Sequence, residues 1–136
     1  IEAGVHEAIM LNTRGEVAEC TGDNIFFVKD GVIVTPETSA GMLHGITRQF
    51  VIDEVAPACG WSVDERVVTK DELFDADEVF LTGTAAEITP VREVDNRKIG
   101  SKKPGKITKL IQKEYSKMVL GQNPKYQDWL ESVRLK

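Results

Sequence analysis

The chain has 136 residues, 41% of them hydrophobic and 29% charged, as in an ordinary globular protein. This length predicts one domain, or part of a larger one. The formal net charge of −5 argues against nucleic acid as the main partner, and no apolar run is long enough to span a membrane.

The first third of the chain predicts short strands. Residues 6–11 and 16–20 are expected to pair across a turn at Asn12 to Gly15. Residues 24–29 and 32–35 are joined by Asp30-Gly31, a dipeptide typical of tight hairpins, and Pro36 stops the second of them. Residues 1–35 are therefore predicted to form a small antiparallel meander.

A helix is predicted next. Residues 37–45 show no period, whereas the following residues place four apolar side chains on one helical face: Ile46, Phe50, Ile52 and Val55. Pro57 and Gly60 predict its end. An ordinary role for Arg48 would be to pair with Asp53 or Glu54 on the same helix.

The middle of the chain alternates strands with one short helix. Residues 61–68 are predicted to be extended, and Thr69 with Glu72 has capping-box spacing for a helix over 70–76. Two further strands are expected over 78–82 and 88–94. Pro90 within the second favours an edge strand or a bulge.

The C-terminal part is predicted to be helical. A basic loop over 100–105 precedes a helix over 107–120, with these apolar members: Ile107, Leu110, Ile111 and Met118. Asn123-Pro124 opens a last helix that carries Trp129, Leu130 and Val133. Strands first, then mixed elements and then helices indicate an α+β (mixed α/β) fold.

Cys20 and Cys59 are too few for a disulfide framework and lack metal-ligand spacing. We therefore expect free thiols in a reducing compartment, a cytoplasmic protein and no metal site. The chain opens on Ile1 and shows no signal peptide, which suggests a piece of a longer protein or a processed product.

Three polar features lie at strand ends or helix starts. They are Glu19 with Asn24, the helix start Gly45-Ile46-Thr47, and the turn Thr82-Gly83-Thr84. Each has an ordinary explanation: a solvated carboxylate, a turn amide and a helix N-cap. A helix start and a hydroxyl-glycine turn, however, both offer N–H groups to an anion such as phosphate. Together with an acid and an amide, they fit a phosphorylated aromatic cofactor with a basic ring nitrogen.

Three ordered motifs carry a family resemblance. E-C-T-G-D-N-I-F-F-V-K-D-G, L-H-G-I-T-R and T-G-T-A-A-E-I-T-P-V resemble the C-terminal portion of branched-chain amino-acid aminotransferases, which are pyridoxal-phosphate enzymes of fold type IV. The resemblance runs from about Glu7 to Val133. It implies the larger, cofactor-binding C-terminal domain of that fold over residues 1–136, with antiparallel-rich sheets and flanking helices.

The resemblance implies roles for matching residues. Glu19 would pair with the cofactor's pyridine nitrogen and keep it protonated, and Asn24 would help to orient the ring. The backbone N–H groups of Ile46 and Thr47 would hold the phosphate, and Gly83 with Thr84 would complete that site. The pocket for the substrate carboxylate would be bordered by Thr84, Ala85 and Ala86.

The sequence departs from the family pattern in four respects. His44 stands where proline is common, Pro57 interrupts a usually continuous helix, and Asp23 replaces a common glutamate. The fourth departure is the lysine that forms a Schiff base with the cofactor, which the family places shortly upstream of the segment beginning here at Ile1, after a small N-terminal domain. Four lysines at a strand end or around the basic loop do not substitute for it: Lys29, Lys102, Lys103 and Lys106.

The implied activity belongs to the parent enzyme. It would transfer the amino group of leucine, isoleucine or valine to 2-oxoglutarate, as a homodimer, while this chain alone would be inactive. Two alternatives within the fold group are a D-amino-acid aminotransferase and an aminodeoxychorismate lyase, although the motif GTAAEITPV favours the branched-chain enzymes. A non-catalytic domain that binds a phosphate ligand through Thr47 and Thr84 is an alternative of another class.

Overall fold

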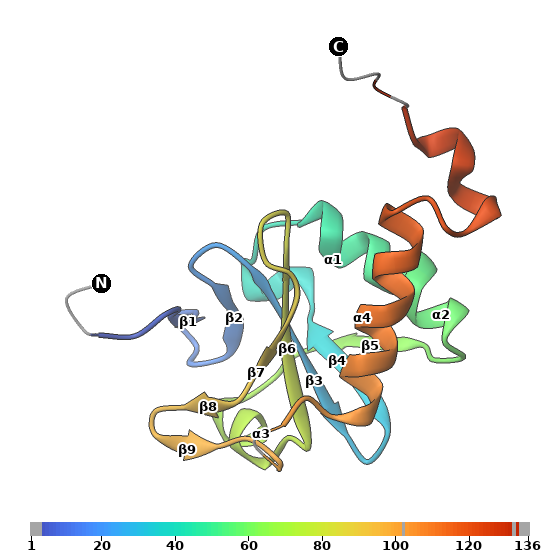
Figure 1. The fold of residues 1–136 in the computed structure, drawn as a ribbon. Coiled ribbons are helices and arrows are strands. Elements are labelled where there is room, and N and C mark those ends of the chain that lie inside the picture. Colours follow the sequence, from blue (N-terminus) through green and yellow to red (C-terminus); the bar gives the residue numbers. More distant parts are fainter. Residues whose placement is uncertain (1–3, 102, 132, 134–136) are drawn as a thin grey trace.

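A five-stranded mixed sheet lies at the centre of the fold (Figure 1). The computed structural model describes residues 4–101, 103–131 and 133. Strands follow the order β5-β4-β3-β6-β7, in which β3 (Asn24–Lys29) pairs antiparallel with both β4 (Val32–Pro36) and β6 (Glu78–Gly83). The sheet is completed by β5 (Val63–Arg66), parallel to β4, and by β7 (Glu87–Val91), antiparallel to β6.

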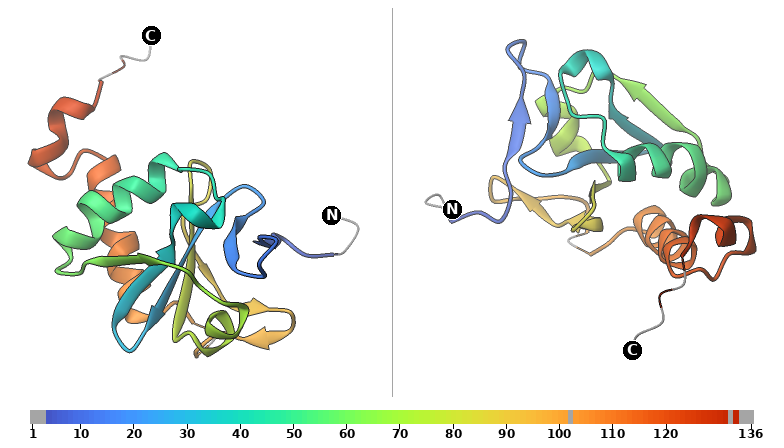
Figure 2. Two further views of the ribbon diagram at one scale, coloured as in Figure 1. Left: turned by 180° about the vertical axis from the view of Figure 1, so that it is seen from behind. Right: turned by 90° about the horizontal axis from the view of Figure 1, so that it is seen from above.

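The first two strands form a sheet of their own. β1 (Ile9–Leu11) pairs antiparallel with β2 (Val17–Cys20), and the views in Figures 1 and 2 place this pair at the opposite end of the molecule from α4 (Lys106–Val119). The predicted meander over residues 1–35 is therefore wrong. β3 pairs with β6 instead of β2. Its side chains are apolar on both faces of the strand, which fits the middle of the larger sheet.

One continuous helical segment connects the parallel strands β4 and β5. It consists of α1 (Ile46–Phe50), a π-helical stretch over Val51–Val55 and α2 (Ala56–Ala58). Gly60 follows with φ 86°, which confirms the predicted stop. This segment and α4 cover the same face of the sheet.

The two faces of β3 serve two apolar clusters, as the alternation of a strand requires. Phe26 and Val28 face the helices, and Phe26 stacks on Phe80 of β6 with ring centroids 4.9 Å apart. Ile25 and Phe27 pack on the opposite side against a cluster that includes Leu73 of α3 (Lys70–Asp75).

Several local predictions are confirmed. Asp30 and Gly31 have φ values of 49° and 81°, as a tight hairpin requires. Thr69 and Glu72 form the capping box at the start of α3. Pro90 lies in β7, at the edge of the sheet, where its missing N–H leaves no gap in a ladder.

Other predictions are wrong in detail. Ile46 is 87% exposed instead of being packed in the apolar core. Arg48 pairs with Glu65 instead of Asp53 or Glu54. The last helix is a 3₁₀ helix over Pro124–Trp129. The hairpin of β8 (Glu93–Val94) and β9 (Arg97–Lys98) was not predicted, and a short 3₁₀ helix, η1, covers Thr38–Ala40. Within the described ranges, no helix is both long and apolar enough to cross a bilayer.

Candidate functional site

Two of the predicted site residues hold the same loop residue. Oε2 of Glu19, on β2, accepts a 2.8 Å hydrogen bond from the backbone N–H of Leu43. Nδ2 of Asn24, at the start of β3, donates a 2.8 Å hydrogen bond to the carbonyl oxygen of Leu43. Glu19 is half-buried and Asn24 is buried. The acid and the amide therefore meet at the loop that leads into α1.

Each of the two predicted anion-binding segments contains a glycine that packs closely against one of two neighbouring residues. A Cβ on Gly45 would lie 2.0 Å from Oδ1 of Asn24, and a Cβ on Gly83 would lie 2.0 Å from Oδ1 of Asp23. Only glycine allows such close approach. Because Asp23 and Asn24 are neighbours, the start of α1 and the turn after β6 lie beside one another.

The start of α1 has no cap of its own. Gly45 is the N-cap and offers no side chain, and the first helical hydrogen bond runs from the N–H of Gln49 to the carbonyl of Gly45 at 3.0 Å. The N–H groups of Ile46, Thr47 and Arg48 precede that bond, so they have no partner within the helix. In the part of the chain that the structure describes, no other acceptor bonds to them.

The start of α4 gives an internal comparison. It also has a glycine N-cap, Gly105, without a side-chain cap. There the carboxylate of Glu78, on β6, accepts from the N–H of Ile107 at 3.1 Å and from the N–H and hydroxyl of Thr108 at 2.7 and 2.6 Å. The protein thus supplies its own anion to α4, whereas α1 is left open.

The turn after β6 borders that open helix start. Thr84 and Ala85 are exposed and Ala86 is half-buried, with its carbonyl accepting 2.7 Å from the hydroxyl of Thr89. Thr82 precedes them, opposite Asn24 in the β3–β6 ladder, and its buried hydroxyl has no partner among the described residues. The turn can therefore present hydroxyl and N–H donors toward α1.

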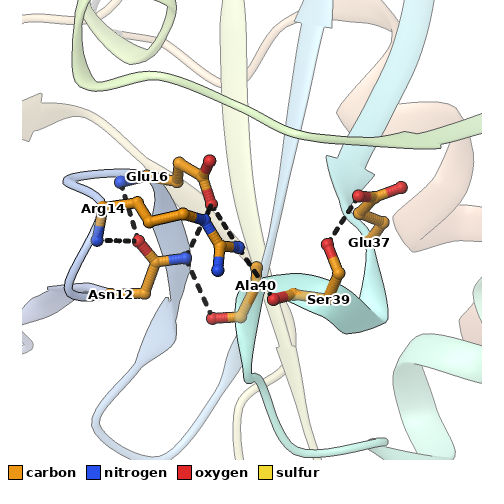
Figure 3. A network of polar contacts seen from close by, with 6 residues as sticks. All are labelled: Asn12, Arg14, Glu16, Glu37, Ser39 and Ala40. Atoms are coloured by element: carbon orange, nitrogen blue, oxygen red, sulfur yellow. Dashed lines mark hydrogen bonds and ion pairs between the residues drawn. The ribbon is translucent and has the colours of Figure 1, made fainter.

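A polar network secures the approach to the loop, as Figure 3 shows. Nδ2 of Asn12 donates to Oε2 of Glu16 at 2.7 Å and to the carbonyl of Ala40 at 3.3 Å. Arg14 pairs with Glu16 at 2.7 Å and donates to the carbonyl of Ser39 at 2.9 Å. The β1–β2 turn is thereby attached to η1, just before the loop that carries Leu43.

The β2 side of the site is acidic. Burial, with a smaller contribution from Glu7, raises the pKa of Asp23. A hydrogen bond from the side chain of Thr21, followed by backbone bonds, lowers the pKa of Glu7. Burial, reinforced by the surrounding carboxylates, raises the pKa of Cys20 to about 12, so this thiol stays protonated at neutral pH.

The described lysines are exposed or half-buried. Lys29 donates to the carbonyl of Asp75 at 2.8 Å and lies 3.1 Å from the carboxylate of the same residue. Its pKa is raised, chiefly by the hydrogen bond to that carboxylate, and a catalytic lysine needs the opposite shift. Lys103 and Lys106 are exposed, and Lys102 lies outside the described residues. The described residues contain no group of three or more ligands that could hold a metal ion.

The sequence motifs indicated the residues that meet here, but not all of the residues that support them. Asp23 lies under Gly83 and Arg48 anchors the first turn of α1, and neither was predicted in that role. Their positions inside the motifs E-C-T-G-D-N and L-H-G-I-T-R were the available signal.

Residues 1–94 match the family described as amino-transferase class IV. A probable branched-chain-amino-acid aminotransferase of Aquifex aeolicus is 49% identical over 131 residues, which is 96% of this chain and 42% of that protein. The branched-chain-amino-acid aminotransferase of Pseudomonas aeruginosa is 47% identical over 98% of this chain and 43% of its own length. The chain thus spans less than half the length of these relatives.

Solved structures of branched-chain aminotransferases contain the fold of this chain. The branched-chain aminotransferase of Thermoproteus uzoniensis, solved with norvaline, has a TM-score of 0.89 and 46% identity over 96% of this chain and 42% of its own. The branched-chain amino acid aminotransferase of T.th., complexed with N-(5'-phosphopyridoxyl)-L-glutamate, has a TM-score of 0.91 and 44% identity over 98% of this chain and 44% of its own.

Proposed function

This chain belongs to the amino-transferase class IV family, and from that premise we propose that it is the pyridoxal-phosphate-binding part of an enzyme that transaminates branched-chain L-amino acids. The observation that carries the proposal is the open start of α1. The N–H groups at the start of α4 donate to the carboxylate of Glu78, whereas those at the start of α1 have no such acceptor among the residues that the structure describes. A helix start of this kind is suited to an anionic ligand.

The residues at this site fit such a cofactor. Ile46 and Thr47 would bind the phosphate through their backbone N–H groups, and Gly83 with Thr84 would bind it from the adjacent turn. The close approach of Gly45 to Asn24 and of Gly83 to Asp23 supports a site shared by these two segments. When bound, the cofactor supplies a ring that withdraws electrons from the substrate α-carbon.

Glu19 would hold a proton on the ring nitrogen. One of its oxygens is engaged by the N–H of Leu43, which fixes the carboxylate in place and would leave the other oxygen for the ring. In this proposal Asn24 acts mainly through Leu43, by orienting the loop on which the ring would rest. Thr84, Ala85 and Ala86 would border the substrate carboxylate.

The substrates and the assembly are proposed for the full-length protein. The relatives' names support leucine, isoleucine and valine as amino donors, and the phosphopyridoxyl-glutamate complex of the T.th. enzyme supports 2-oxoglutarate as acceptor. We further propose that the Schiff-base lysine lies outside this chain, and that the protein is a cytoplasmic homodimer.

The test uses the full-length protein with leucine, isoleucine or valine and 2-oxoglutarate. Turnover should be lost in Glu19→Ala with the cofactor still bound, and kept in Glu114→Gln, which changes a carboxylate paired with Lys117 on α4. Turnover of D-alanine, or cleavage of aminodeoxychorismate, would replace this proposal by one of the other activities. Phosphate-ligand binding without any turnover, unchanged by Glu19→Ala, would favour a non-catalytic domain.

A further inference from the structure

Arg48 is the largest fully buried side chain of the described protein, at 2% exposure. Its Nη2 donates 2.6 Å to Oε2 of Glu65 and 3.0 Å to the carbonyl of Pro36. Burial of a charge is costly unless the charge is paired and hydrogen-bonded. Stability alone therefore does not account for a charged side chain at this position.

The contact joins the first turn of α1 to the ends of two strands. Pro36 is the last residue of β4, and Glu65 lies next to Arg66, the partner of Pro36 in the parallel ladder. Arg48 follows Thr47 directly. Its guanidinium therefore fixes the same turn that carries the free N–H groups of Ile46 and Thr47.

A contribution to helix stability does not explain this arginine. A cation in the first turn opposes the positive end of the helix dipole, so this position is unfavourable for Arg when the helix is considered alone. Its hydrogen bonds bind the strand ends and not an anion: Nη2 donates to Glu65 and to Pro36 on the sheet side, while the buried Nε has no partner among the described residues. What remains is the orientation of the helix start.

We propose that Arg48 is a positioning residue for the anion site: through Glu65 and Pro36 it places the N–H groups of Ile46 and Thr47 where a phosphate binds. The loop side of the same turn is placed by Asn24 against Gly45. The two contacts determine where α1 begins relative to the Gly83 turn. This inference rests on the proposed function for the identity of its anion.

The experiment compares Arg48→Met, Arg48→Lys and Glu65→Gln in the full-length protein. The matched control is Arg66→Met, because Arg66 lies next to Glu65 on β5 but pairs with Asp64 and Glu72 instead of α1. The measurements are the dissociation constant for pyridoxal 5'-phosphate, the ³¹P chemical shift of the bound phosphate, and the thermal midpoint of the cofactor-free protein.

Arg48→Met should weaken cofactor binding about tenfold and shift or broaden the ³¹P signal, since a small displacement of binding groups has effects of this order or larger. Arg48→Lys should restore part of the affinity, Glu65→Gln should give a smaller loss, and Arg66→Met should change neither the affinity nor the signal. A lower thermal midpoint with unchanged cofactor affinity and ³¹P signal would overturn the inference. If Arg48→Met does not fold, the same two readouts on Arg48→Lys and Glu65→Gln decide.

Failure of the proposed function gives a different result. A wild-type protein that binds inorganic phosphate but not the cofactor contradicts the proposed function alone, and the effect of Arg48→Met on phosphate affinity then tests the positioning role. A wild-type protein that binds neither probe overturns both.

Discussion

The amide oxygen of Asn24 packs directly against Gly45. A Cβ atom added to Gly45 would lie only 2.0 Å from that oxygen. Gly45 itself has φ −69° and ψ 134°, a conformation open to any residue. Glycine is thus required by the neighbour and not by the backbone.

Gly45→Ala should therefore destabilise the full-length protein by about 1–3 kcal/mol, as overpacking does, and weaken cofactor binding by displacing the start of α1. Denaturant unfolding and cofactor titration measure the two effects. Gly22→Ala is the matched control, because a Cβ there meets nothing within 4 Å. Equal behaviour of the two variants would contradict the close contact.

The polar network at the β1–β2 turn predicts unequal effects for two of its members. Asn12 is half-buried and its amide bonds both Glu16 and the backbone of η1, so Asn12→Ala should cost about 1–3 kcal/mol by leaving partners unsatisfied. Arg14 has a side chain that is 56% exposed, so solvent screens its ion pair and Arg14→Ala should cost less stability than Asn12→Ala. Chemical denaturation ranks them, and a larger loss in Arg14→Ala would show that the ion pair dominates the network.

The capping box of α3 predicts an effect that depends on the hydroxyl group of Thr69. The hydroxyl of Thr69 accepts 3.3 Å from the N–H of Glu72, whose carboxylate accepts 2.9 Å from the N–H of Thr69. Thr69→Ala should lower the unfolding free energy by about 1 kcal/mol, whereas Thr69→Ser, which keeps the hydroxyl, should retain most of it. The prediction fails if both variants lose the same stability.

Cys20 predicts a loss of stability at alkaline pH. Its pKa is about 12 in the folded protein because of burial, against 9.0 for an ordinary thiol. Above the ordinary value the unfolded chain releases this proton and the folded protein keeps it, so the contribution to stability is full below that pH and declines as the pH rises toward the folded pKa.

Cys20→Ala should remove that part of the alkaline decline, as thermal midpoints across the alkaline range would show. Native-state alkylation is a second measurement, in which the half-buried Cys59 should react before the buried Cys20. The same pH dependence in wild type and variant, together with rapid alkylation of Cys20, would contradict the prediction.

Local signals in the sequence predicted most elements but not their partners. Asp30-Gly31 and Thr69 with Glu72 act over a few residues, and both predictions are confirmed. The choice of β6 over β2 as the neighbour of β3 depends on a distant segment, which local patterns cannot specify.

The face of the α1 helix was predicted wrongly for a different reason. A single helical period places Ile46 with Val55, but the π-helical stretch Val51–Val55 has a wider turn and shifts the phase. Ile46 precedes that stretch, at the first position of α1, where it faces solvent, and Arg48 occupies the buried position. For the site, the motifs indicated Gly45, Gly83 and Asn24, whereas the close contact of Asp23 required the three-dimensional arrangement.

The central position of β3 also sets an order of assembly. A two-residue turn joins β3 to β4, so this hairpin can form early from local contacts, whereas β6 arrives from far along the chain and must first overcome the entropy of closing a long loop. Asn24 faces Thr82 only once β6 has docked. A chain emerging from the ribosome would thus gain its hairpin well before its binding site, and the site would be among the last parts of this domain to mature.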